Sequence, residues 1–221
     1  MKQLKISYCY ANQLNDIKEG YMKNIFKSML GITISAFGIA CVTNSDIGAF
    51  ALTAASKSLG NLTGIHFSIM YMMIEIGFLT WATFKGEGVG WTAILNGTYG
   101  SLMIGQFHEI LPHHPIMVWC AFLIPVGYSI MGKAGLGETG SNIFTTTIMK
   151  MTGWNVIITR FLLEMSLLGI GFIAAREYVT IYSLLLTILA GPVIHVIYHT
   201  FKFKPTKVEH NYLIKLSKSK I

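Results

Sequence analysis

The chain has 221 residues, of which 52% are hydrophobic and only 12% are charged, and its mean hydropathy is +0.54. Soluble domains carry roughly 25% charged residues, and a chain this short could hardly bury several apolar stretches of about 20 residues. The composition therefore excludes an ordinary soluble domain and indicates an integral membrane protein.

The net charge of +7 is concentrated at the two ends of the chain. Lysines are frequent in the N-terminal segment 1–27 and in the basic tail 202–221. A basic chain can indicate nucleic acid, but charges that flank membrane segments are better explained by orientation and by anionic lipid headgroups. We therefore expect membrane lipids as partners and no nucleic acid.

Six apolar runs follow one another, at about 28–45, 64–84, 90–108, 116–132, 154–175 and 179–201. Each is close to the roughly 20 residues that a helix needs to cross the hydrocarbon core. Helices are expected because backbone groups that face lipid must be hydrogen-bonded within their own segment. The predicted fold class is an all-α membrane protein with six transmembrane helices.

The basic residues of the connections predict the orientation. With both termini in the cytoplasm, fourteen lysines fall on the inner side and only Lys57 and Arg176 on the outer side, while Arg160 lies within a span. Positive residues accumulate on the cytoplasmic side of membrane proteins. We expect a multi-pass protein of the cell membrane with both termini cytoplasmic.

Two connections are more than simple turns. Residues 46–63 (DIGAFALTAASKSLGNLT) and 135–152 (GLGETGSNIFTTTIMKMT) begin with glycines and continue with small residues, Ser and Thr. Both are too polar to span the bilayer. A short helix that folds against the bundle, or re-enters it, is predicted in each.

The sequence repeats its landmarks at a shift of 89 residues. Four matches carry this observation: Gly38 with Gly127, Gly48 with Gly137, Thr63-Gly64 with Thr152-Gly153, and Glu75 with Glu164. Three spans per repeat is an odd number, so the second copy must cross the membrane in the opposite direction. This predicts two inverted three-helix repeats, at 28–110 and 115–201, each with a short extra helix after its first span.

The pattern also resembles a known family. Its landmarks are Gly38, Ile47-Gly48, Leu59, Thr63-Gly64 and 86-GEGVGWTAILNG-97 in the first half, and Gly135-Leu136-Gly137, Thr152-Gly153, Arg160, Glu164 and Gly191-Pro192 in the second. Over residues 26–201 this is similar to the YczE/YyaS/YitT-like bacterial membrane proteins. The stretch 48-GAFALT-53 departs from the Gly-Pro-Trp-Asp-like turn of that family. The resemblance implies a six-span architecture and no settled biochemical activity.

Charged residues within the spans are the leading site candidates. Arg160 and Glu164 are four residues apart, so they share a helix face and can pair. Since a charge at the membrane centre is costly, both should face the bundle interior. Glu75 has Tyr71 rather than a cation at the corresponding position. One hypothesis is that Glu75 takes up a proton and couples transport to it; the alternative is a structural polar lock between the repeats.

Further polar residues are candidates for a substrate or ion pathway: Asn44, Asn96 and Asn142. Such residues can equally hold helices together through hydrogen bonds. Six glycines are predicted to be structural: Gly38, Gly48, Gly64, Gly127, Gly137 and Gly153. The histidines of 108-HEILPHHP-115 can be read as metal ligands, but a solvated, proline-bounded loop is the simpler interpretation.

No catalytic arrangement stands out, and the three cysteines form no CxxC pair, so we expect neither an enzyme nor a cofactor or metal. The leading functional prediction is a secondary transporter of a small polar or ionic solute, with proton coupling as the accompanying hypothesis. A non-transporting membrane scaffold or regulator that binds a protein partner is the alternative. The sequence does not indicate the oligomeric state.

Overall fold

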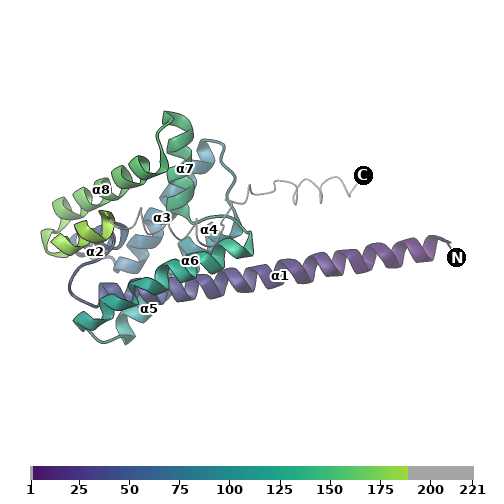
Figure 1. Ribbon diagram of the computed structural model, residues 1–221, viewed down its shortest axis with the longest axis horizontal. Coiled ribbons are helices and arrows are strands. Elements are labelled where there is room, and N and C mark those ends of the chain that lie inside the picture. The colour runs from purple at the N-terminus through teal and green to yellow at the C-terminus, as the bar shows by residue number, and fades with distance from the viewer. Residues whose placement is uncertain (1, 189–221) are drawn as a thin grey trace.

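The computed structural model describes the backbone of residues 2–188 and the side chains of residues 20–188 except Glu177. Within that range every regular element is helical (Figure 1). The elements are α1 (Lys2–Thr43), α2 (Ala51–Thr63), α3 (Phe67–Phe84), α4 (Trp91–Leu95), the π-helical η1 (Asn96–Gly100), α5 (Ser101–Ile110), the 3₁₀ helix η2 (Pro115–Phe122), α6 (Leu123–Ala134), α7 (Gly140–Thr152), α8 (Val156–Ala174) and the 3₁₀ turn η3 (Arg176–Tyr178). A further helical stretch covers 181–188.

Four helical segments are long and apolar enough to cross a membrane: Gly20–Thr43, Phe67–Phe84, Pro115–Ala134 and Val156–Ala174. They correspond to the first, second, fourth and fifth predicted spans. The predicted third span, 90–108, falls on the helical run of α4, η1 and α5, which is not among the four. The predicted sixth span, 179–201, extends beyond the described residues.

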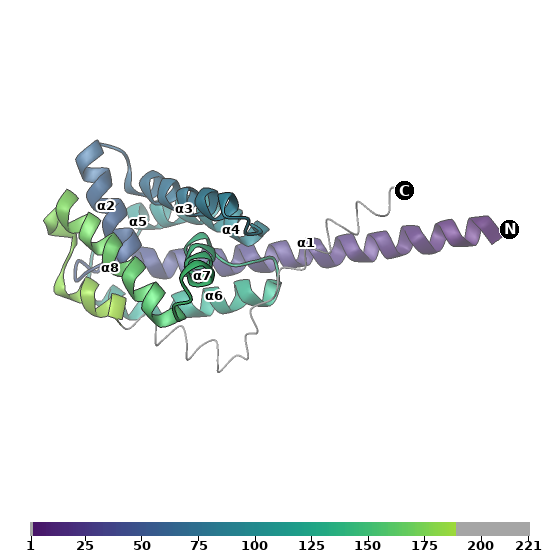
Figure 2. The same cartoon turned by 90° about the horizontal axis from the view of Figure 1, so that it is seen from above.

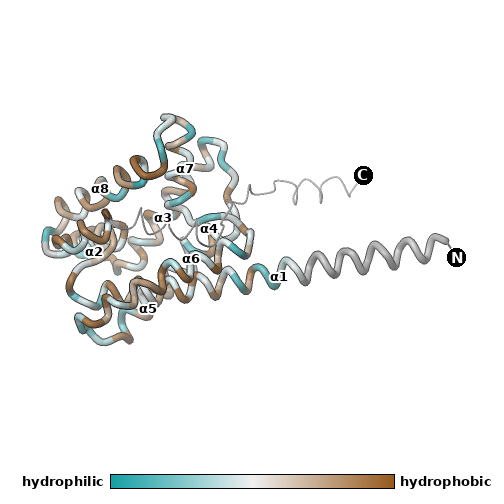
Figure 3. The backbone as a smooth tube through the Cα atoms, viewed as in Figure 1, coloured by the Kyte–Doolittle hydropathy of each residue, from teal (hydrophilic) through white to brown (hydrophobic). Residues whose placement is uncertain are grey.

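Large hydrophobic side chains are exposed on the outward faces of α3 and α8, among them Ile69, Met73, Phe161 and Leu162. Figure 3 shows hydrophobic residues along the helices of the bundle rather than only in its centre. Apolar surface on this scale is unfavourable in water. The molecule is therefore compatible with an integral membrane protein whose outer surface faces lipid.

Helix α1 is longer than the sequence predicts. The first span was placed at 28–45, but the helix begins at Lys2 and its membrane-compatible part begins at Gly20. Figures 1 and 2 show its N-terminal half extending beyond the bundle. The segment 1–27 has no apolar run of its own, so hydropathy gave no sign that the helix continues into it.

Helices α1 and α6 pack closely and run in opposite directions. A Cβ atom added at Gly31 would lie 2.9 Å from the Met131 nitrogen, and one added at Gly38 would lie 3.2 Å from the Ile124 nitrogen. The partner number falls as the α1 number rises, which defines an antiparallel pair. Glycine permits this approach because it has no side chain to separate the backbones.

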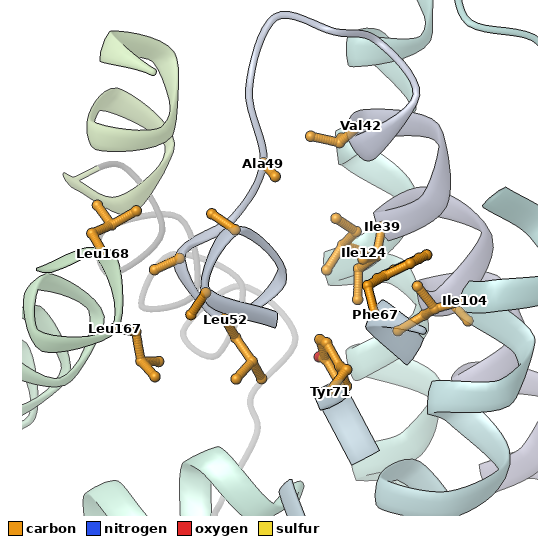
Figure 4. Close-up of a cluster of buried hydrophobic side chains, with 14 of the residues drawn as sticks. Ile39, Val42, Ala49, Leu52, Phe67, Tyr71, Ile104, Ile124, Leu167 and Leu168 are labelled. Atoms are coloured by element: carbon orange, nitrogen blue, oxygen red, sulfur yellow. The ribbon is translucent and has the colours of Figure 1, made fainter. Parts of the chain in front are cut away.

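A hydrophobic core joins this pair to the rest of the bundle. Figure 4 shows Ile39 of α1 and Ile124 of α6 near Phe67 of α3, with Leu52 of α2 and Leu167 of α8 in the same cluster. Of the two short helices, α2 packs against α8 and α7 packs against α3. Each short helix therefore packs against a long helix from the other half of the chain.

The helix bounds follow the same shift of 89 residues as the sequence landmarks. Helix α2 starts at Ala51 and α7 at Gly140, and both have 13 residues. Helix α3 starts at Phe67 and α8 at Val156, and each has a side-chain cap at its N-terminus. The sequence period is thus also a period in the local structure.

Each of the six glycines predicted to be structural has an identifiable place. Gly64 and Gly153 end α2 and α7 with φ values of 73° and 74°, a left-handed conformation that favours glycine. The other four lie at close approaches: Gly38 and Gly127 between α1 and α6, Gly48 against Thr180 and Ser183, and Gly137 against Gly90.

Candidate functional site

Polar side chains from four helices meet inside the bundle, and we refer to them as the polar cluster. Its members are Tyr71 and Glu75 of α3, Tyr128 of α6, Asn142 of α7, and Arg160 and Glu164 of α8. Because the helices come from both halves of the chain, the cluster depends on tertiary packing. It contains two acidic side chains and one basic side chain.

Arg160 is the centre of this cluster. Its Nη2 lies 2.6 Å from Oε1 of Glu164, so the ion pair predicted from their four-residue spacing is present. Its Nη1 donates a hydrogen bond of 3.1 Å to Oδ1 of Asn142. The two side chains of the pair are 17% and 8% exposed, which means that lipid or water screens the pair only slightly.

The guanidinium group is not fully satisfied. Nε of Arg160 is buried and has no hydrogen-bond partner among the described residues. A buried donor without a partner typically costs about 1–3 kcal/mol. Arg160 therefore retains the capacity to donate one more hydrogen bond at this position.

Glu75 is the most buried charged residue of the cluster, with 1% of its surface exposed. Its carboxyl group lies against the first turn of α7, where Oε2 occupies the place that a Cβ atom at Gly140 would take. The backbone at Gly140 and Ser141 and the Ser141 hydroxyl lie close to this carboxyl group. The N-terminus of a helix attracts negative charge, so this position is favourable for a carboxylate.

Glu75 nevertheless lacks a complete set of partners. Its Oε2 atom is buried without a hydrogen bond from the residues that the structure describes. Arg160 lies within electrostatic range, but its direct ion pair is with Glu164. With both carboxylates ionised the three charged groups carry a net charge of −1. Protonation of Glu75 would leave the Arg160–Glu164 pair neutral.

Two tyrosines complete the surroundings. Tyr71 is 4% exposed and lies within electrostatic range of Glu75, Glu164, Arg160 and Tyr128. The phenol groups add hydrogen-bonding capacity without adding charge. The sequence pointed to Tyr71 through its spacing from Glu75, but gave no signal for Tyr128, whose role depends on how α6 packs.

The π-helical segment η1 lies beside Glu75. A Cβ atom added at Gly97 would be 3.6 Å from the Glu75 Cβ. Asn96, a predicted pathway residue, opens this segment and is 8% exposed. π-Helical turns are rare in proteins, and those that occur are often found at functional sites. Neither this turn nor its place next to Glu75 is predicted from the sequence.

Asn44 lies apart from the polar cluster in its contacts. Its side-chain nitrogen donates to the carbonyl oxygens of His108 and Leu111, at 2.9 and 2.8 Å, and its side-chain oxygen contacts the His108 ring. It therefore fastens the end of α1 to the end of α5. The structure brings together Glu75, Asn142, Arg160 and Glu164 among the predicted pathway residues, places Asn96 beside them, and gives Asn44 this different role.

The histidine-rich segment is tied to the α1–α2 connection and to α3. His113 approaches Asp46 at 3.3 Å and His66 approaches Glu109 at 3.4 Å. Over the part of the chain that the structure describes, no three His, Cys, Asp or Glu side chains are arranged to hold a metal ion. These contacts hold neighbouring loops together.

Comparison with protein-family models, with curated proteins and with solved structures finds no match for this chain. What can be said of its chemistry therefore rests on the polar cluster and on the fold that surrounds it.

Proposed function

We propose that this chain is a secondary transporter that moves a small polar or ionic solute through the centre of the bundle. The observation that carries the proposal is the polar cluster, in which Glu75 and Arg160 each retain a buried atom without a hydrogen-bond partner among the described residues. A purely structural ion-pair network favours complete satisfaction of its groups. Incomplete satisfaction of a buried polar network is expected where a solute or a proton supplies the missing contacts.

The proposed architecture is six spans in two inverted repeats, in the cell membrane, with both termini in the cytoplasm. Three observations support it. The bounds of α2 and α7 differ by the same 89 residues as the sequence landmarks, α1 runs antiparallel to α6, and the pairing of α2 with α8 is matched by that of α7 with α3. Inverted repeats of this kind enclose a site near the membrane midplane, where the polar cluster would lie.

We also propose that the chain is related to the YczE/YyaS/YitT-like proteins, on the basis of the landmark residues that the two share. Its residue landmarks include Thr63-Gly64 and Thr152-Gly153, which end the two short helices. They also include Arg160 and Glu164 of the polar cluster. These landmarks thus fall on residues with a defined structural place, while Gly191-Pro192 lies outside the described residues.

Alternating access would use the two short helices as moving parts. Helix α7 carries Asn142 and begins beside Glu75, so its movement relative to α3 would open the polar cluster. Protonation of Glu75 would weaken the attraction between its carboxyl group and the N-terminus of α7. This gives proton uptake a direct route to the packing of α7 on α3.

The test is solute flux in liposomes that contain the purified protein and an internal pH-sensitive dye. A panel of small neutral, cationic and anionic solutes is added outside, and both solute uptake and proton movement are recorded. We expect one class of solute to enter and Glu75→Gln to abolish the accompanying proton movement. Glu109→Gln, which changes an exposed glutamate of α5 outside the cluster, serves as the control. If no solute crosses with well-folded protein, the transport proposal fails.

A second candidate function is a membrane scaffold or regulator that acts through a protein partner. The observation that favours it is the long N-terminal part of α1, which extends beyond the bundle as a helix (Figure 2). Deletion of the first 19 residues separates the two functions. A transporter should keep solute flux, while a scaffold should lose its partner.

A further inference from the structure

We propose that the start of α7 and Arg160 form a binding site for a small monovalent anion, such as a small carboxylate, and that the Glu75 carboxylate occupies this site until it is protonated. The inference deepens the proposed transport function by assigning the class of solute, and it rests on that function only for the claim that the anion is moved. Binding itself can be tested independently.

The donors at the site are arranged for an anion. Helix α7 has 13 residues, and the backbone at its first two positions, Gly140 and Ser141, lies close to the Glu75 carboxyl group together with the Ser141 hydroxyl. The hydrogen bonds that close the first turn of α7 come from the next two nitrogens, of Asn142 and Ile143, to the Thr139 carbonyl. The first N–H groups of a helix are ready donors for an anion.

The Glu75 carboxylate occupies the proposed site in this structure. Glu75 is 1% exposed, and its Oε2 sits where a side chain on residue 140 would begin. That oxygen has no hydrogen-bond partner within the described range, while the backbone at Gly140 and Ser141 and the Ser141 hydroxyl are hydrogen-bonding neighbours of the carboxyl group as a whole. A carboxylate that rests in an anion site with incomplete bonding can be replaced by a free carboxylate.

Arg160 provides the second half of the site. Its Nη1 and Nη2 are engaged by Asn142 and Glu164, which fix the guanidinium plane. Its Nε is buried without a partner in the described structure. Glu75 lies within electrostatic range of the guanidinium group, so an anion that displaces the Glu75 carboxylate would lie in the same field.

The charge balance requires a proton. Within the part of the chain that the structure describes, the charged groups near Glu75 are Arg160 and Glu164 of α8, with Tyr71 of α3 and Tyr128 of α6 as the neighbouring phenols. An anion beside two ionised carboxylates and one guanidinium group would bring the net charge to −2. With Glu75 protonated, the bound anion, Glu164 and Arg160 together carry a net charge of −1. This equals the net charge of the cluster without an anion when Glu75 is ionised. Binding of one anion is therefore coupled to uptake of one proton.

Among the described residues, the other titratable side chains on the helices around α3 have contacts elsewhere. Their contacts are Lys57 over the Phe67 and Tyr178 rings, Tyr99 with Thr33, His108 with Asn44, Glu109 with His66, and Lys150 with Glu87. The pH dependence of anion binding is thus assigned to Glu75.

The test measures the dissociation constants of acetate, formate and chloride for the full-length protein in detergent, in sulfonate buffer, by titration calorimetry. Between about pH 5.5 and pH 7.5, coupling to one proton predicts that Kd for a bound anion rises by up to about tenfold per pH unit. Glu75→Gln mimics the protonated residue, so it should bind the same anion with a Kd that does not change with pH. Glu109→Gln, at an exposed residue of α5 that pairs with His66, should behave as the unmodified protein.

Gly140→Ala is a second variant that does not alter charge. Its added Cβ would take the place of the Glu75 oxygen and narrow the site, so it should weaken anion binding at least tenfold at the lowest pH. Gly169→Ala, on α8, is the matched control, because no atom of another described segment lies within 4 Å of its added Cβ. It should leave binding unchanged.

The inference is overturned if none of the three anions binds either the unmodified protein or Glu75→Gln. It is also overturned if binding to the unmodified protein does not depend on pH, or if Glu75→Gln keeps the same pH dependence. Uptake of only a neutral or cationic solute in liposomes, without anion binding, would refute the anion site and leave transport standing. Anion binding with the expected pH dependence but without flux would support the anion site and refute transport.

Discussion

The close contact between α1 and α6 makes a quantitative prediction at Gly127. A Cβ atom added there would lie 2.7 Å from both the Ser35 nitrogen and the Ser35 Cβ, and would also collide with the Gly31 carbonyl oxygen. Two of these atoms belong to the backbone, so no side-chain rotation can relieve the overlap. Gly127→Ala must therefore push the two helices apart.

The size of the effect follows from two opposing contributions. Overpacking in a well-packed contact costs about 1–3 kcal/mol, while alanine in place of a helical glycine returns about 0.5–1 kcal/mol. We expect a net loss of about 1–2 kcal/mol in the free energy of unfolding. For a chain of this length that corresponds to a fall in Tm of about 2–8 °C.

The assay is thermal unfolding of the purified protein in one detergent, followed by intrinsic fluorescence. Gly169→Ala is the matched control, because an added Cβ there meets no atom of the other described helices within 4 Å. Its Tm should stay equal or rise slightly. If Gly127→Ala melts at the same temperature as Gly169→Ala, α1 and α6 are not packed as described, and the antiparallel pairing loses its main support.

Three further predictions concern polar contacts. Asn44→Ala leaves two carbonyl groups at the end of α5 without their donor, so we expect a loss of about 1–3 kcal/mol, measured as a lower Tm. Arg160→Gln leaves Glu164 buried and unpaired, at a cost of about 3–5 kcal/mol in the free energy of unfolding. The double variant Arg160→Gln/Glu164→Gln should recover part of the folded yield measured by gel filtration. A lower yield for the double variant than for Arg160→Gln alone would contradict the ion pair. Burial raises the pKa of Glu138, in the α6–α7 connection. The folded state then holds this proton more tightly than the unfolded state, so stability should fall as the pH rises above the unfolded value of about 4.3, and Glu138→Gln should reduce that dependence in melting curves.

Much of the membrane-facing architecture could be predicted from hydropathy, because an apolar run of span length leaves few alternatives. Four of the six predicted spans coincide with helices that are long and apolar enough to cross a membrane. The shift of 89 residues was also visible, since glycines such as Gly64 and Gly153 mark the ends of the short helices. By contrast, the helical continuation of α1 to Lys2 has no apolar pattern that would reveal it.

The polar cluster could be predicted only in part. The Arg160–Glu164 pair follows from spacing along one helix, which is a local property. The contact of Glu75 with Gly140 joins residues of α3 and α7 and depends on how those helices pack. Hydrophobic pattern alone does not specify such a contact, and the same holds for the approach of Tyr128.

The first residues of the two short helices differ by a single methyl group. Under the proposed repeat, Ala51 of α2 corresponds to Gly140 of α7, and Glu164 corresponds to Glu75. The missing methyl leaves room for the Glu75 carboxylate at the start of α7, whereas α2 carries an alanine Cβ at its first position. In the proposed repeat, two halves with matching helix bounds thus differ in their chemistry: Glu164 is in an ion pair with Arg160, whereas Glu75 lies against the start of α7.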